Sequence, residues 1–133
     1  MIDIYKLDDF TTAYIECALW CTNDESDESG GEPLDDNYGI GDISQKALES
    51  IVEDCKDFQE SNKELLEQAY ELYTPSAWTP QSQAGHDFML TRNGHGAGFW
   101  DRGIGEVGNK LTKACEPYGE CYFYVGDDGK IYV

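Results

Sequence analysis

The chain has 133 residues, 40% of them hydrophobic and 13% aromatic, which is enough to bury the core of one folded domain. It carries 27 acidic against 9 basic side chains, a formal net charge of −18 at pH 7, and this charge disfavours nucleic acid and anionic membranes as partners. No apolar run approaches the ~20 residues that a membrane-spanning helix needs.

The negative charge is concentrated in the first half of the chain. Residues 1–73 carry 20 acidic and 4 basic side chains, whereas residues 74–133 carry 7 and 5. We expect one α+β domain over residues 1–133, with an acidic helical part at 1–73 and a second part at 84–133. A partner with a basic surface would suit the acidic part.

The five cysteines are an odd number and follow an N-terminus without a secretory signal, so we expect reduced thiols in a cytoplasm. Cys17 and Cys21 are four residues apart and would share one face of a helix, as half of a zinc site does. The chain has no Cys-x-x-Cys pair to complete such a site. We interpret both as small buried residues and expect neither a metal nor a cofactor.

Apolar residues recur at intervals of three and four from Leu7 to Cys21 and predict a helix, with Asp8 or Asp9 at its N-cap. Trp20 and its neighbours extend the apolar surface beyond one face, which indicates a core helix.

Residues 22–42 are expected to form a loop. Seven acidic side chains and no basic one lie within residues 24–36, where Gly30, Gly31 and Pro33 interrupt regular structure. The acidic spacing differs from that of an EF-hand, so we expect no calcium site and interpret the segment as a mobile acidic loop.

A long helix is predicted from Ile43 to Tyr73, capped by Asp42, and Ser61-Asn62 marks a candidate break. Acidic residues recur along one face of it at intervals of three and four. This acidic row consists of Glu49, Glu53, Asp57, Glu60, Glu64, Glu67 and Glu71.

The acidic row would be about 33 Å long at about 1.5 Å per residue, with one charge per about 5.5 Å. Duplex DNA carries one charge per about 1.7 Å, so the row alone is too sparse to imitate DNA. The acidic residues of the 24–36 loop would bring the charge density of this surface closer to that of DNA.

The most information-dense stretch is His86–Gly103. Alternation predicts a strand over residues 86–93, Asn93-Gly94 predicts a hairpin turn, and residues 96–100 form the returning strand. A short helix follows at residues 106–116. A second hairpin follows, with residues 121–125 and 130–133 as its strands. This ββαββ part supplies a small antiparallel sheet on which the N-terminal helices pack, so the predicted fold class is α+β.

Three polar residues of this stretch are candidate catalytic groups, namely His86, His95 and Asp101. In the predicted hairpin, His86 and Asp101 lie at the same open end, where Asp101 can orient His86 as an acid–base group. Arg92 and Arg102 can then bind an anion. A small hydrolase or ligand-binding enzyme is therefore one alternative.

The other interpretations give the His86–Gly103 stretch no catalytic role. Its glycines and rings fold a tight hairpin with satisfied polar groups, or Phe99, Trp100 and Arg102 form a surface that binds a partner.

Three segments resemble a family of small proteins encoded in bacteriophage genomes. They are AYIECALW at Ala13–Trp20, HDFMLTRNGHGAGFWDRG at His86–Gly103 and YVGDDGKIY at Tyr124–Tyr132. The resemblance implies a phage product that acts in the cytoplasm of a bacterial host, and it carries no catalytic residue to this chain.

We therefore expect an acidic phage accessory protein that binds and modulates a host protein with a basic surface. A nucleic-acid-mimicking inhibitor of a defence nuclease is the sharpest form of this hypothesis. The expected contact surface is the acidic row with Phe99, Trp100 and Arg102, and we expect no direct binding to nucleic acid or membrane. The alternatives are the enzyme described above and a phage protein with a purely structural or accessory role.

Overall fold

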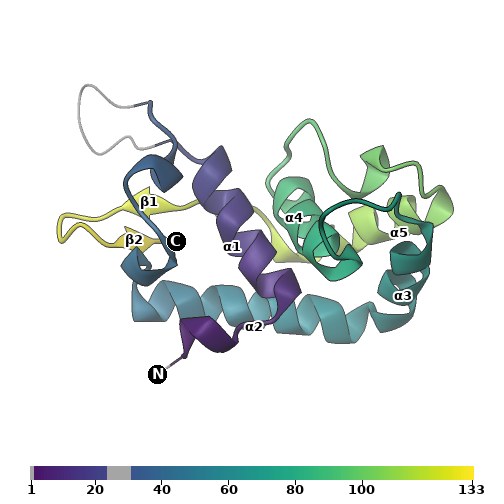
Figure 1. Cartoon of the computed structure of the whole chain (residues 1–133), viewed down its shortest axis with the longest axis horizontal. Coiled ribbons are helices and arrows are strands. Elements are labelled where there is room, and N and C mark those ends of the chain that lie inside the picture. Colours follow the sequence, from purple (N-terminus) through teal and green to yellow (C-terminus); the bar gives the residue numbers. More distant parts are fainter. Residues whose placement is uncertain (1, 24–30) are drawn as a thin grey trace.

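The computed structural model describes residues 2–23 and 31–133, which form five α-helices and one two-stranded antiparallel sheet (Figure 1). None of these helices is both long enough and apolar enough to cross a membrane. The elements are α1 (Asp9–Cys21), α2 (Gln45–Ser61), α3 (Lys63–Leu72), α4 (Pro80–Arg92), α5 (Glu106–Cys115), β1 (Tyr124–Val125) and β2 (Ile131–Tyr132).

Helix α1 lies at the centre of the molecule and packs mainly against α4. Asp8 is its N-cap: the Asp8 side chain accepts a hydrogen bond from the Thr11 backbone N–H at 2.8 Å. Side chains are buried on most sides of α1, which confirms the predicted core helix. Close packing against α4 depends on Gly85, because a Cβ built there would lie 1.9 Å from the Phe10 carbonyl oxygen.

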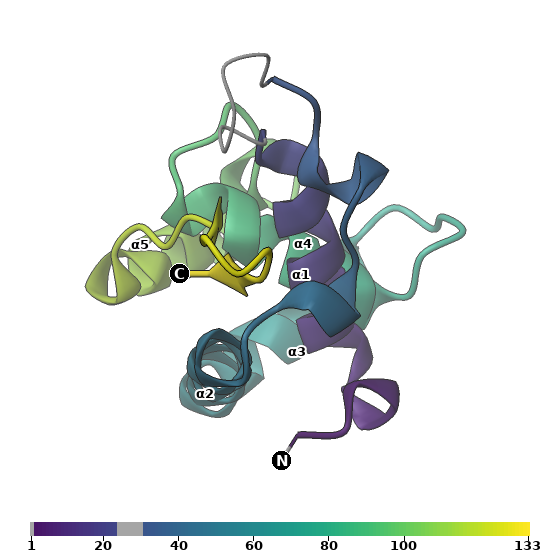
Figure 2. The same ribbon diagram turned by 90° about the vertical axis from the view of Figure 1, so that its left-hand side faces the viewer.

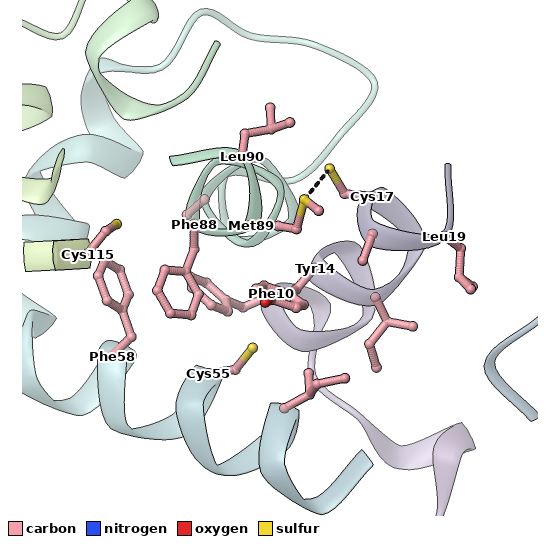
Figure 3. Close-up of a cluster of buried hydrophobic side chains, with 14 of the residues drawn as sticks. Phe10, Tyr14, Cys17, Leu19, Cys55, Phe58, Phe88, Met89, Leu90 and Cys115 are labelled. Carbon is pink, nitrogen blue, oxygen red and sulfur yellow. Dashed lines mark hydrogen bonds between the residues drawn. The ribbon is translucent and has the colours of Figure 1, made fainter. Parts of the chain in front are cut away.

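Aromatic rings from three helices form the middle of the core (Figure 3). The rings of Phe58 on α2 and Phe88 on α4 stack with centroids 4.2 Å apart, and Phe10 of α1 packs against both. Cys55 lies beside them and is fully buried. This core therefore joins the acidic first half of the chain to the second half.

The predicted long helix is divided at Asn62 into α2 and α3, and the chain changes direction there (Figure 1). The N-cap of α2 is Ser44, whose hydroxyl accepts from the Ala47 backbone N–H at 3.2 Å. The prediction of Asp42 as the cap was wrong, because Asp42 instead accepts from the Gly39 N–H of the preceding 3-10 turn. The helix therefore starts two residues later than predicted.

The C-terminal hairpin is confirmed, with Tyr124 opposite Tyr132 and Val125 opposite Ile131. The Ser44 N–H donates to the Ile131 carbonyl at 2.8 Å, so the hairpin is attached to the start of α2. Helix α5 is also confirmed, with Leu111 fully buried.

The predicted α+β class and the ββαββ arrangement over residues 84–133 were wrong. Residues 86–92 belong to α4, and the N-terminal helix packs against this helix, not against a sheet. The start of α4 carries helix signals: Thr79 caps it and Pro80 occupies its first turn. Its burial on nearly all sides removes the 3.6-residue hydrophobic period, so a short stretch of it resembles a strand.

The predicted hairpin turn at Asn93-Gly94 is the C-terminal cap of α4. The Gly94 N–H donates to the Thr91 carbonyl at 3.2 Å, and the His95 N–H donates to the Leu90 carbonyl at 3.0 Å. With Gly94 at φ +69°, these two bonds form a Schellman motif. Asn-Gly supplies the left-handed conformation for a helix end as readily as for a hairpin.

The predicted returning strand over residues 96–100 is instead irregular chain that leads into a 3-10 turn at Phe99–Asp101. The predicted loop over residues 22–42 holds two further 3-10 turns, Leu34–Asp36 and Ile40–Asp42. Much of the predicted mobile acidic loop at 24–36 lies outside the described residues, because residues 24–30 are not among them.

Candidate functional site

The three candidate catalytic residues occupy separate positions. His86 is on α4, His95 follows the cap of that helix, and Asp101 is exposed at the end of a 3-10 turn. Across residues 2–23 and 31–133, neither histidine forms an ion pair with Asp101, and no three His, Cys, Asp or Glu side chains are grouped to hold a metal ion. The fold thus does not assemble the predicted acid–base pair.

Arg102 is held by Asp87, an acid of the same stretch on α4. The Asp87 Oδ1 atom lies 2.7 Å from Arg102 Nη2 and 2.9 Å from Arg102 Nε. Gln83 also donates to Oδ1 and the Tyr73 hydroxyl donates to Oδ2, both at 3.1 Å. Asp87 is fully buried, so this network joins α3 and α4 to the segment before α5.

Arg92 is the second structural arginine. Its Nη1 atom lies 3.0 Å from Asp54 Oδ2 and 3.2 Å from the Tyr14 hydroxyl, and its other nitrogens donate to the carbonyls of Tyr118 and Gly119. The two arginines predicted to bind an anion are therefore each paired with a carboxylate of the protein.

His86 lies beside the segment that connects α3 to α4. The ring of Trp78 meets the His86 ring edge-on, with centroids 4.9 Å apart. The Nδ1 atom of His86 is buried and has no hydrogen-bond partner among the described residues. Burial lowers the pKa of His86 below 6.5, and the Arg102 charge lowers it further against the opposing effect of Asp87. Burial thus favours the neutral form of His86.

A groove of about 730 Å³ lies between one face of α1, the segment before α4 and the start of α4. We call it the α1–α4 groove. Its size is within the range of sites that hold small ligands or short peptide segments. The described residues that line it are Asp9, Thr12, Ala13, Glu16, Cys17, Trp20, Asp35, Ala77, Trp78, Thr79, Ser82 and His86.

Two features define the chemistry of this groove. Three carboxylates line it, no described lining residue is Lys or Arg, and burial favours the neutral form of the one histidine. Trp20 and Trp78 also line it although they are 61% and 50% exposed, an unusual exposure for rings of this size. The groove therefore presents aromatic surface together with negative charge.

The thiol in the groove is not an activated nucleophile. Cys17 Sγ lies 3.6 Å from Met89 Sδ and 3.8 Å from Cys21 Sγ, so the two thiols share one helix face as predicted. Burial raises the pKa of Cys17 well above its usual range, and Cys21 raises it further. All five cysteines are free.

The acidic row is exposed along its whole length on α2 and α3. Trp100 is 49% exposed, whereas Phe99 is fully buried and stacks against Phe58 in the core. Of the three other predicted contact residues, Trp100 therefore offers the largest surface, and Arg102 is tied to Asp87.

The sequence does contain a signal for the α1–α4 groove. Asp9, Thr12, Ala13, Glu16 and Trp20 recur at three and four, which places them on one face of α1. That Trp78 and His86 also line the groove could be seen only once α4 was placed beside α1. The predicted hairpin excluded such a helix.

Comparison of the chain with protein-family models, with curated proteins and with solved structures found no match.

Proposed function

We propose that this protein binds a protein partner with a basic surface, and that the acidic row on α2 and α3 attracts that partner. The observation that carries the proposal is the charge of the row. All seven of its carboxylates are exposed, and the two ion pairs found among residues 2–23 and 31–133 involve Arg92 and Arg102 with other acids.

The row keeps its negative charge because the lysines of the same two helices do not neutralise it locally. Lys46, Lys56 and Lys63 are exposed, and none lies within 4 Å of a described carboxylate oxygen. Unpaired surface charge of one sign acts over about a Debye length, roughly 8 Å at physiological salt, and accelerates association with an oppositely charged protein. This geometry favours an electrostatic docking surface.

The resemblance to bacteriophage proteins extends this proposal to a host protein in a bacterial cytoplasm. Inhibition of a defence nuclease by imitation of DNA is its narrowest form. The break at Asn62 limits the straight part of the row to the four acids of α2, which span about 17 Å at about 1.5 Å per residue. A compact basic patch therefore matches the row better than a long DNA channel.

Affinity capture from bacterial lysate, with two charge-matched variants, tests the proposal. The row variant replaces Glu53, Glu60, Glu64 and Glu67 by Gln. The control replaces Asp101 and Asp127 by Asn and Glu106 and Glu116 by Gln; all eight residues are exposed. We expect wild type and control to capture the same basic protein at about 0.05 M salt and to release it at about 0.5 M.

The row variant should capture at least tenfold less of this protein. If both variants lose the captured protein equally, the net charge of the chain explains the binding, and this result would contradict a defined docking surface. If the captured protein is a nuclease, competition with duplex DNA decides whether the two share one site.

A further inference from the structure

We propose that the α1–α4 groove receives an arginine side chain of the basic partner, with the guanidinium held between the Trp20 and Trp78 rings and the carboxylates of Glu16 and Asp35. This inference deepens the proposed function and rests on it, because the arginine comes from the same partner. The row attracts the partner, and the groove makes the specific contact.

The charge of the groove selects a cation. Asp9, Glu16 and Asp35 line it, and the described lining residues contribute no basic side chain to neutralise them. Asp9 accepts a hydrogen bond from the Thr79 hydroxyl at 3.1 Å, which fixes it at the start of α4. Glu16 and Asp35 are exposed, as Asp9 is, but no described residue donates a hydrogen bond to either of them, so these two carboxylates are the ones accessible to a guanidinium.

The tryptophans select a flat cation over a compact one. Indole faces attract cations within about 6 Å of the ring centroid, and guanidinium also stacks on an aromatic plane, which an ammonium cannot do. Trp78 is held in place by its edge-on contact with His86 and by the bond from its backbone N–H to the Ser76 hydroxyl at 3.1 Å. Part of the aromatic surface is thus positioned before a ligand arrives.

The volume indicates a side chain carried on a peptide. About 730 Å³ accommodates a drug-sized molecule, so it has room for an arginine and parts of its neighbours. His86 also lines the groove, and its buried Nδ1 atom has no hydrogen-bond partner among the described residues, which is uncommon for a buried polar atom.

The groove and the row are separate surfaces that can be altered independently. The segment between α3 and α4, which carries Trp78, lies on the side of α1 away from α2 (Figure 2). Substitutions in the groove therefore leave the row intact, and the reverse also holds.

The test is titration of the full chain with two blocked tripeptides, Gly-Arg-Gly and Gly-citrulline-Gly, followed by NMR. Citrulline keeps the shape of arginine and removes its charge. We expect the arginine peptide to shift the indole N–H signals of Trp20 and Trp78 and to leave that of Trp100 in place. The citrulline peptide should bind at least tenfold more weakly.

Matched variants locate the site. Trp78→Ala and Asp35→Asn should each weaken binding of the arginine peptide about fivefold. Trp100→Ala and Asp36→Asn should bind it as wild type does, because Trp100 is as exposed as Trp78 and Asp36 adjoins Asp35, yet neither lines the groove. Circular dichroism of each variant checks that the helices are retained.

Equal affinity for the two peptides, or shifts confined to α2 and α3, would overturn the groove assignment while leaving the proposed function standing. Failure of the proposed function has a different signature, because the row variant then behaves as its charge-matched control does in lysate capture.

Discussion

Gly85 of α4 lies against the backbone of Phe10 in α1, so closely that a Cβ at position 85 would be 1.9 Å from the Phe10 carbonyl oxygen. The contact sets the distance between the two helices that form most of the groove and carry much of the core. An added methyl group can be accommodated only if backbone moves, since the atoms it meets are main-chain atoms.

Gly85→Ala should therefore lower the free energy of unfolding by about 3 kcal/mol, at the upper end of the usual cost of overpacking. Helix propensity alone predicts the opposite sign, a gain of up to about 1 kcal/mol. Urea denaturation measures the difference, with Gly41→Ala as control because a Cβ there meets nothing within 4 Å. A stabilised Gly85→Ala protein would contradict the helix contact described here.

The Asp87–Arg102 pair predicts an unequal effect of removing its two members. Asp87 is fully buried, whereas the Arg102 side chain is 27% exposed and reaches water. Arg102→Met leaves a buried carboxylate without its counter-charge and should cost about 3–5 kcal/mol at pH 7. Asp87→Asn should cost less, about 2 kcal/mol, because water solvates part of the remaining charge.

Chemical denaturation of the two variants at pH 7 compares these costs. If Asp87→Asn lowers the free energy of unfolding more than Arg102→Met does, the burial of Asp87 is not the reason that the two substitutions differ. A near-zero cost for Arg102→Met would mean that the bond between the two residues does not hold in solution.

His86 predicts a pH dependence of stability. Burial places the folded-state pKa of His86 below its ordinary value of 6.5, so the unfolded chain binds the proton more readily. The contribution of neutral His86 to stability is therefore complete above pH 6.5 and is lost as the pH falls through 6.5 toward the folded-state pKa. His86→Gln should flatten this part of the stability profile between pH 7.5 and about pH 5.5.

NMR titration of the His86 ring checks the cause directly. Trp78→Ala exposes the ring to water and should move its pKa back toward 6.5, against the fixed charges of Asp87 and Arg102. A His86 pKa above 6.5 in the wild-type protein would exclude the buried environment described here.

Gly94 predicts the cost of losing the cap of α4. At φ +69° an alanine is strained, so Gly94→Ala should destabilise the protein by about 1 kcal/mol, whereas Gly94→Asn should cost less. Gly96→Ala is the control: position 96 lies two residues away, has no positive φ, and a Cβ built there meets nothing within 4 Å. Equal effects at positions 94 and 96 in thermal denaturation would argue against the Schellman motif.

The secondary structure was predicted correctly where a local sequence pattern is typical of only one kind of element. The first helix, α5 and the C-terminal hairpin were predicted because cap residues, hydrophobic spacing and turn residues are read over a few neighbouring positions. The prediction failed at α4, where Asn93-Gly94 serves a helix end as well as a hairpin turn and burial on nearly all sides removes the helical period. The incorrect strand then placed His86 opposite Asp101.

The acidic row, the core character of α1 and the unequal charge of the two halves can all be read from the amino-acid sequence. Each of these follows from residue type and spacing along a single element. Three other relationships depend on the packing of the helices: α1 lies against α4, Asp87 holds Arg102, and Trp20 and Trp78 line one groove. These relationships join residues from 15 to 75 positions apart, and their distances depend on a close backbone contact at Gly85 that no local pattern encodes.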